Sequence, residues 1–276
     1  MKMNVHESHE LKNKQLPFYF KKRAYNKNQS SLYANWHENV EILYFTKGSA
    51  TVFADSQRFY VKEGGIFAIG ANSLHSISAA GGDVEYCYLI VDRSFCTENG
   101  FDTSLLSFDC TVENEKIRHA LNRLIDEYPL GDALPFYTLR IRNTVLEIMT
   151  ELCINHAKGK PDSEKTSRSA ACIKKAIALI AASFERDLPL DEVADFVGLD
   201  KFYFSHEFKK YTGQTFVNYL NRIRCKAATT LLRESTLSIA EVGQKCGFQG
   251  RSYFAKCFAR IMGQTPGEYR KNSARH

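Results

Sequence analysis

Two stretches near the end of the chain carry basic and small polar side chains at helical spacing, a pattern that suits contact with a nucleic acid. In the second stretch Arg251, Ser252 and Lys256 share one helix face by their spacing. Arginine and lysine can reach guanine O6 and N7 in a major groove, whereas serine and histidine make shorter contacts with bases or phosphates. The candidate contact residues are Lys201, Phe202, Ser205, His206, Lys209, Arg251, Ser252, Lys256 and Arg260.

The alternative interpretation is a solvated helix surface whose charges keep the protein in solution. For a single helix of this kind, that interpretation is favoured over DNA binding. A repeat changes this weighting. The segment Leu190–Tyr219 recurs as Ile239–Tyr269, offset by 49 residues before an internal turn (247 − 198) and by 50 after it (253 − 203). Two matched units favour DNA binding, because a duplicated helical unit can hold two successive faces of a duplex.

Each copy predicts a helix-turn-helix, with a short helix, a turn that contains glycine, and a longer second helix. Pro189 suits the first helical position of the first copy, and Ser238 with Glu241 predicts a capping box in the second. Residues 216–232 contain no glycine or proline and predict one helix that joins the two units. The small apolar cores are expected from Leu190, Val193, Phe204 and Phe208 and from Ile239, Val242, Phe254 and Phe258.

The positive charge of the chain is concentrated in the repeated region. From Ser169 onward there are 17 Lys and Arg and 10 Asp and Glu, a balance of +7, so the remainder, with 20 and 21, carries −1. This asymmetry suits a polyanionic partner. No apolar run approaches the roughly 18 residues that span a bilayer, and the polar start carries no secretion signal. The cysteines lack CxxC spacing, which predicts reduced, mostly buried thiols.

The part of the chain before the repeat predicts short strands followed by a pair of helices. Strand-like apolar runs between turn residues occur at 40–45, 51–53, 58–61, 66–69 and 86–91, which is typical of a sandwich or barrel. From about Asn114 the periodicity becomes helical, with apolar faces made by Ile117, Leu121, Leu124 and Ile125 and by Leu139, Val145, Leu146, Met149 and Leu152. The helix pair either covers the open side of the sheet or forms a dimer face.

The repeated region closely resembles the DNA-binding domain of the AraC/XylS family of bacterial transcription regulators. The resemblance covers about residues 172–272 and runs the full length of the family's C-terminal signature, through Ile239-Ala240-Glu241-Val242, Cys246-Gly247-Phe248 and Gly263-Gln264-Thr265-Pro266. The first copy departs from this signature, with Phe216-Val217 where the second has Pro266-Gly267. That difference fits a helix that continues in the first copy and a stop in the second.

The first region is similar to the family's sensor domain, a cupin-type β-barrel, along Trp36–Ala50 and Gly64–His75. Metal-binding cupins use a His-x-His pair, a glutamate and a later histidine; His37, Glu41 and His75 match, but Asn35 replaces the first histidine. An effector-pocket role or hydrogen bonding within the barrel is therefore favoured, and neither a metal nor another cofactor is predicted. The resemblance implies a pocket for a small effector, with candidate residues Trp36, His37, Glu41, Tyr44, His75 and Tyr86.

The expected architecture is multidomain, with separate β and α parts. Its expected segments are a cupin-like sensor barrel (1–112), a helical pair for dimerisation (113–158), a linker (159–168) and a double helix-turn-helix domain (169–276). The resemblance implies a homodimeric transcription activator, not an enzyme, that binds promoter DNA, RNA polymerase and a small effector such as a sugar. It is expected in the bacterial cytoplasm, at the nucleoid. Two alternatives stay open: a metal-dependent cupin enzyme fused to a DNA-binding domain, and a constitutive architectural DNA-binding protein.

Overall fold

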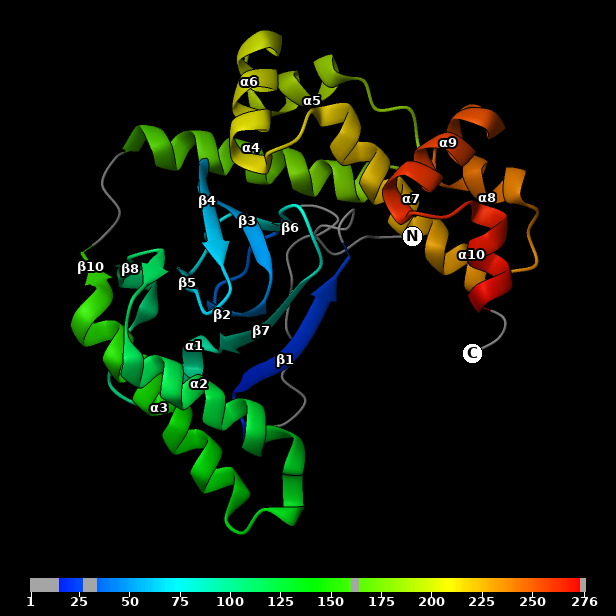
Figure 1. Ribbon diagram of the computed structural model, residues 1–276. Coiled ribbons are helices and arrows are strands. Elements are labelled where there is room, and N and C mark those ends of the chain that lie inside the picture. The colour runs from blue at the N-terminus through cyan, green and yellow to red at the C-terminus, as the bar shows by residue number, and fades with distance from the viewer. Residues whose placement is uncertain (1–14, 27–33, 160–163, 274–276) are drawn as a thin grey trace.

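The computed structural model describes residues 15–26, 34–159 and 164–273, and it places a β-rich N-terminal domain beside a helical C-terminal one (Figure 1). The predicted fold class, a multidomain chain with separate β and α parts, is confirmed. The eight cysteines are free, and most of them are buried, as the sequence predicts. Among the described residues, no helix is long and apolar enough to cross a membrane.

Two antiparallel sheets form the N-terminal domain, with strand orders β1-β7-β2-β5-β9 and β4-β3-β6. The larger sheet contains β1 (Phe18–Tyr25), β2 (Val40–Lys47), β5 (Ile66–Ile69), β7 (Val84–Val91) and β9 (Thr111–Val112). The smaller contains β3 (Ser49–Ala54), β4 (Gln57–Lys62) and β6 (His75–Ala79), and a separate short pair joins β8 (Ser107–Phe108) to β10 (Ala157–Lys158). All five predicted runs are strands; β1 and β6 escaped notice because polar residues interrupt their apolar pattern.

Strand β2 separates two hydrophobic cores, because successive side chains of a strand point to opposite faces. Leu43 and Phe45 pack between the two sheets, together with Val52 of β3. Ile42 and Tyr44 point the other way, into the core that the sheet shares with the helices. The space between the sheets is therefore reached only by the odd-numbered residues of β2.

A helix pair covers the outer face of the larger sheet. The helical elements of this domain are α1 (Arg93–Glu98), the 3-10 helices η1 (Thr103–Leu105) and η2 (Tyr128–Ala133), α2 (Glu115–Glu127) and α3 (Tyr137–His156). Ile117 of α2 and Val145 of α3 share a core with Ile42 of the sheet, so the covering role is confirmed. The assignment of Leu139 to the buried face was wrong, since its side chain is 68% exposed. Its distance of six residues from Val145 is not a helical repeat.

The C-terminal domain consists of seven helices within the described residues. They are α4 (Glu164–Ser183), α5 (Leu190–Val197), α6 (Lys201–Thr212), α7 (Phe216–Glu234), α8 (Ile239–Lys245), α9 (Arg251–Met262) and α10 (Pro266–Ser273). Helix α4 begins inside the stretch predicted as linker, of which residues 160–163 lie outside the described part. Glutamate, lysine and arginine are good helix formers, so a stretch without apolar residues can still be helical.

The ends of the helices in both units are made by local hydrogen bonds and by glycine. The predicted capping box is present: Ser238 accepts from the N–H of Glu241, and Glu241 accepts from the N–H of Ser238. Gly198 and Gly247 both adopt positive φ, at 70° and 85°, which an L side chain rarely adopts. Pro189 is the N-cap of α5 rather than its first helical residue.

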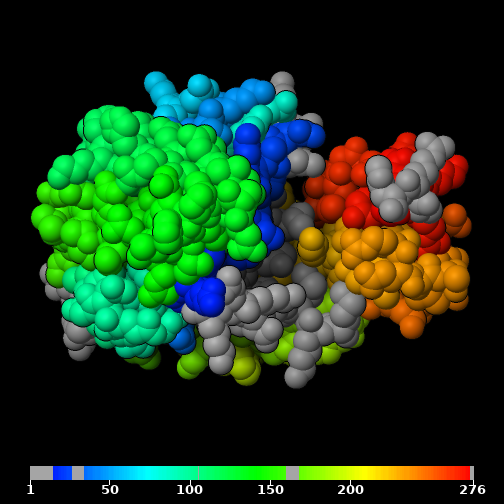
Figure 2. Space-filling model, turned by 90° about the horizontal axis from the view of Figure 1, so that it is seen from below, coloured from blue at the N-terminus to red at the C-terminus, as the bar shows by residue number. Residues whose placement is uncertain are grey.

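The barrel packs on the first helix-turn-helix unit. Ala34, Trp36 and Leu74 of the N-terminal domain belong to the same hydrophobic core as α4, α6 and α7. The buried hydroxyl of Tyr219, on α7, donates to the carbonyl oxygen of Ala34 over 2.8 Å. We call the contact of these three residues with α4, α6 and α7 the domain seam. Seen from below, the second unit, in orange and red, stands apart from the green helix pair (Figure 2).

Candidate nucleic-acid interface and barrel site

The second helices of the two units, α6 and α9, present their polar faces to solvent. Phe204 and Phe208 of α6 and Phe254 and Phe258 of α9 are fully buried on the opposite face. All nine predicted contact residues are exposed, namely Lys201, Phe202, Ser205, His206, Lys209, Arg251, Ser252, Lys256 and Arg260. Even the aromatic ring of Phe202 is 80% exposed. The fold therefore leaves both faces open to a large partner.

The sequence repeat is also a repeat of packing. In each unit two phenylalanines of the second helix and a tyrosine of the following helix pack in a row, with their rings tilted or edge to face. The stacks are Phe204, Phe208 and Tyr219 in the first unit and Phe254, Phe258 and Tyr269 in the second. Neighbouring ring centroids lie 5.4 and 5.3 Å apart in the first stack and 5.6 and 5.6 Å apart in the second. Both exposed faces therefore have the same rigid support.

The two units differ in the charge that they offer. Helix α6 begins after Asp200, whose carboxylate accepts from the N–H groups of Phe202 and Tyr203. Lys201 is paired with Asp191 of α5 at 2.7 Å. Helix α9 begins after Gly250, without a side-chain cap. The second unit therefore has no carboxylate at the N-cap of its second helix, where the first unit has Asp200.

A basic groove joins the two units. Lys209 at the end of α6, Arg222 of α7 and Arg260 of α9 line a hollow of about 400 Å³, together with Asn218. Burial and the nearby charge of Arg260 lower the pKa of Arg222. An anion placed in this groove would relieve that repulsion. Sequence reasoning missed Arg222, because α7 was treated as a connector; its position four residues after Asn218 on the same helix face was the available signal.

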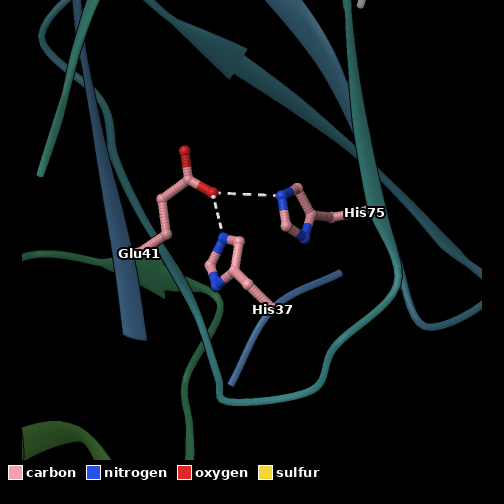
Figure 3. Close-up of side chains that lie close together, drawn as sticks. All are labelled: His37, Glu41 and His75. Carbon is pink, nitrogen blue, oxygen red and sulfur yellow. Dashed lines mark hydrogen bonds and ion pairs between the residues drawn. The ribbon is translucent and has the colours of Figure 1, made fainter. Parts of the chain in front are cut away.

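Three buried polar side chains meet inside the barrel (Figure 3). Glu41 comes from β2, His75 begins β6, and His37 lies just before β2. The Nε2 atoms of His37 and His75 lie 3.1 and 3.0 Å from the same Glu41 oxygen, Oε2. The three side chains are 1%, 4% and 6% exposed for His37, His75 and Glu41. Burial acts to raise the pKa of Glu41, but hydrogen bonds with both histidines hold it well below its usual range.

The open space beside this cluster is small. It measures about 30 Å³, and its polar lining comes from Arg23, Tyr25, Asn35, Glu41, His75, Ser76, Tyr86 and Tyr88. A water molecule needs about 10–15 Å³ of such space, so the space suits one or two water-sized ligands. The barrel in this state is therefore closed to larger molecules at this point.

Comparison with known proteins adds two family matches. Residues 193–272 match the model of a helix-turn-helix domain, and residues 22–149 match that of an AraC-like ligand-binding domain. The two matches occur in the order expected of a sensor followed by a DNA-binding domain. This chain belongs to the AraC family of transcription regulators.

Among relatives of this AraC-family regulator is the regulatory protein PocR of Salmonella typhimurium, 35% identical over 137 residues. That match covers 48% of the chain and 45% of PocR, so the chain spans less than half of PocR. The transcriptional activator RhaR of Escherichia coli is 22% identical over 247 residues, 85% of each protein. The fatty-acid-bound crystal structure of ToxT from Vibrio cholerae matches 92% of this chain and 94% of ToxT, with 14% identity and a TM-score of 0.44.

In this regulator the six predicted pocket residues fall into two groups. His37, Glu41 and His75 meet in one cluster, and Tyr86 lines the space beside it. Trp36 instead packs in the domain seam, and Tyr44 lies in the core under the helix pair. The strand period explains Tyr44, because it is three residues from Glu41 and so points to the opposite face. Arg23 and Ser76, which also line the space, belong to β1 and β6, two strands that were not predicted.

Proposed function

We propose that this AraC-family regulator reads a specific DNA sequence with α6 and α9 and that a ligand in the barrel controls it. The observation that supports this most strongly is the pair of exposed polar faces on identical aromatic supports. The nine predicted residues are proposed as contacts to bases and phosphates, and Arg222 as a phosphate contact in the basic groove. The proposed segments are those expected from the sequence, with barrel residues 1–112, helix pair 113–158, linker 159–168 and DNA-binding domain 169–276, except that α4 already begins at Glu164.

Selection of duplexes from a random pool by the full-length chain, followed by hydroxyl-radical footprinting, tests the proposed reading of DNA. We expect two protected patches about one helical turn, roughly 10 base pairs, apart, since each second helix enters a major groove. A duplex of the same composition in shuffled order serves as the control. Failure to enrich any sequence, or a single protected patch, would contradict the proposal.

The regulator is further proposed to be an activator that contacts RNA polymerase at a promoter. The name of RhaR as a transcriptional activator supports this role. We place the protein in the bacterial cytoplasm, bound to the nucleoid, and propose no catalytic activity for it. Transcription in vitro, with the selected sequence upstream of a weak promoter, should increase when the regulator is added. An unchanged or reduced transcript would exclude activation.

A small effector, with a sugar as one candidate, is proposed to bind in the barrel next to the domain seam. Asn35, Glu41 and Tyr86 line the closed space and are the proposed polar contacts of this effector. A sugar needs more room than the 30 Å³ of the closed space, so its binding requires the barrel to open. An effector can shift that equilibrium only by its higher affinity for one state. A thermal-shift screen of the full-length chain against metabolites should identify compounds that raise its melting temperature.

The exposed side of α3 is proposed as the surface of a homodimer. Leu139 and Ile154 on this helix are 68% and 73% exposed, and Phe136 just before it is 80% exposed. Residues three or four apart on a helix lie on the same side. Leu139 and Ile154 are linked by such steps through Asn143, Leu146 and Thr150, so they lie on one side of α3. Sedimentation should show a dimer for the wild type and a monomer for Leu139→Arg with Ile154→Arg. Tyr60→Arg, at an exposed aromatic residue of β4, should leave the dimer intact.

The small space in the barrel disfavours the alternative of a metal-dependent enzyme fused to a DNA-binding domain. A catalytic site needs room for a substrate beside its reactive groups. The space of about 30 Å³ next to Glu41 and His75 admits only one or two water-sized ligands. Regulation by a bound ligand is the better proposal for this domain.

A further inference from the structure

Each histidine of the barrel cluster uses its Nδ1 atom as a donor to the backbone. The Nδ1 atom of His37 lies 3.1 Å from the carbonyl oxygen of Asn39, and that of His75 lies 3.0 Å from the carbonyl oxygen of Ser73. A carbonyl oxygen only accepts hydrogen bonds, so both Nδ1 atoms carry the hydrogen. In a neutral imidazole the other nitrogen, Nε2, then presents a lone pair.

The two Nε2 atoms point at one carboxylate oxygen. All three potential ligand atoms lie within 4.8 Å of one another. Two neutral imidazoles would direct lone pairs at the Glu41 carboxylate, so these short contacts require a positive charge, carried either by protons on the histidines or by a cation. Two protons would supply it, but they would create two buried imidazolium ions whose ring centroids are 5.2 Å apart. One divalent cation supplies the same charge and leaves both histidines neutral.

The spacing of the cluster fits such an ion. Tetrahedral zinc lies about 2.0–2.1 Å from nitrogen and oxygen ligands, which sets neighbouring ligand atoms about 3.3 Å apart. The two Nε2 atoms are already 3.1 and 3.0 Å from Oε2 of Glu41. Small side-chain rotations would therefore admit an ion. The adjoining space of about 30 Å³ can hold one further ligand, such as a water molecule.

We propose that His37, Glu41 and His75 bind one divalent transition-metal ion through the two Nε2 atoms and the Glu41 carboxylate. A set of two imidazoles and one carboxylate suits Zn²⁺, Mn²⁺ or Fe²⁺. The Nδ1–H bonds to the backbone are the outer contacts that fix the orientation of metal-binding histidines. The proposal stands apart from the reading of DNA, since none of its residues lies on α6 or α9.

The same two segments carry both the metal ligands and the domain seam. Asn35 and His75 exchange backbone hydrogen bonds of 3.0 and 2.9 Å, and the N–H of Asn72 donates to the carbonyl oxygen of His37 over 2.7 Å. Trp36 and Leu74, each next to a ligand in the sequence, pack against the first helix-turn-helix unit. A bound ion would therefore link the segments around His37 and His75, which also contact the DNA-binding domain.

Titration of the metal-free, untagged, full-length chain with Co²⁺ tests the site. We expect one equivalent to bind and to give the visible d–d absorption of an ion with four or five ligands, which Zn²⁺ then abolishes. Glu41→Gln and His75→Gln should each weaken binding by about 100-fold or more, because losing a direct ligand should cost at least as much as losing an outer contact. His119→Gln, at an exposed histidine of α2, is the matched control and should bind as the wild type does.

Saturable binding that is lost in both ligand variants supports the site. No saturable Co²⁺ binding by the wild type, or equal affinity in Glu41→Gln and His75→Gln, overturns it. Circular dichroism checks the fold of each variant. If both variants unfold, X-ray absorption spectroscopy of the wild-type protein with bound Co²⁺ tests the site instead. Two imidazole ligands on the ion are the expected result, and a shell of oxygen ligands alone overturns the site. Binding of the selected duplex by the same variants separates loss of metal from loss of DNA reading.

Discussion

Individual basic residues of α9 are expected to matter more than their counterparts on α6. Lys201 is held by Asp191, and the start of α6 carries the carboxylate of Asp200. Arg251 and Lys256 take part in no ion pair among the residues that the structure describes. A side chain that must first leave an acidic partner contributes less to binding, because the lost ion pair offsets part of the new contact.

Arg251→Ala and Lys256→Ala are each expected to weaken binding to the selected duplex by about 1–3 kcal/mol if the side chain reads a base. The loss should be smaller on duplexes already altered at the contacted base pair. Titrations at several salt concentrations measure both effects. A residue that contacts only phosphate would instead weaken all sequences about equally and flatten the salt dependence.

Lys271→Ala, on α10, removes the same charge from an exposed position outside the two second helices and is the matched control. Its affinity should stay close to that of the wild type. Unchanged affinity and unchanged sequence preference in both α9 variants would remove these residues from the interface.

Among the elements, the turn between α8 and α9 is tightly constrained. Gly247 has a φ of 85°, and a Cβ atom there would collide with the carbonyl oxygen of Phe184 and lie 3.0 Å from that of Glu185. Arg224 donates to Phe184 and Arg186 carbonyl oxygens, each over 2.9 Å, and so holds that backbone in place. The neighbouring chain cannot retreat without breaking these bonds, so the turn accepts only glycine.

Gly247→Ala should therefore lower the free energy of unfolding by more than about 1 kcal/mol, since both the φ angle and the space exclude a side chain. Gly267→Ala, in the first turn of α10, meets nothing within 4 Å and should be neutral or stabilising. Urea denaturation of the two variants measures the difference. Equal stability of the two would show that the turn relaxes more easily than its contacts indicate.

Local patterns in the sequence predicted most elements but only part of the site. Apolar periodicity and capping residues lie within one element, and they were sufficient for β2, the helix pair and both helix-turn-helix units. The meeting of His37 with His75 depends on the pairing of Asn35 with His75, a contact between distant segments. The family resemblance suggested that meeting. Nothing in the sequence predicted that Trp36 lies in the domain seam, because this position depends on how the two domains pack.

At the scale of the whole molecule, the domain seam couples the sensor barrel to the first DNA-binding unit. Ala34, Trp36 and Leu74 complete a core that otherwise belongs to the helical domain. Lys174 of α4 donates to the carbonyl oxygen of Asn72, in the loop before His75. Gly213, at the C-terminal end of α6, lies against the ring of Phe53 in β3. A Cβ atom at Gly213 would be 3.1 Å from that ring. We therefore expect a change of shape inside the barrel to act on α6 through these direct contacts.

Tyr219→Phe tests this coupling, because it removes one buried hydroxyl and leaves the aromatic stack in place. The carbonyl oxygen of Ala34 loses its 2.8 Å hydrogen bond and stays in an apolar core, which should cost about 1–3 kcal/mol. We expect faster hydrogen exchange at residues 34–36 and 72–75 and a lower melting temperature. Tyr203→Phe, at a half-exposed tyrosine of α6, is the matched control. If exchange at the seam is the same in both variants, this hydrogen bond does not hold the domains together, and the coupling depends on apolar packing alone.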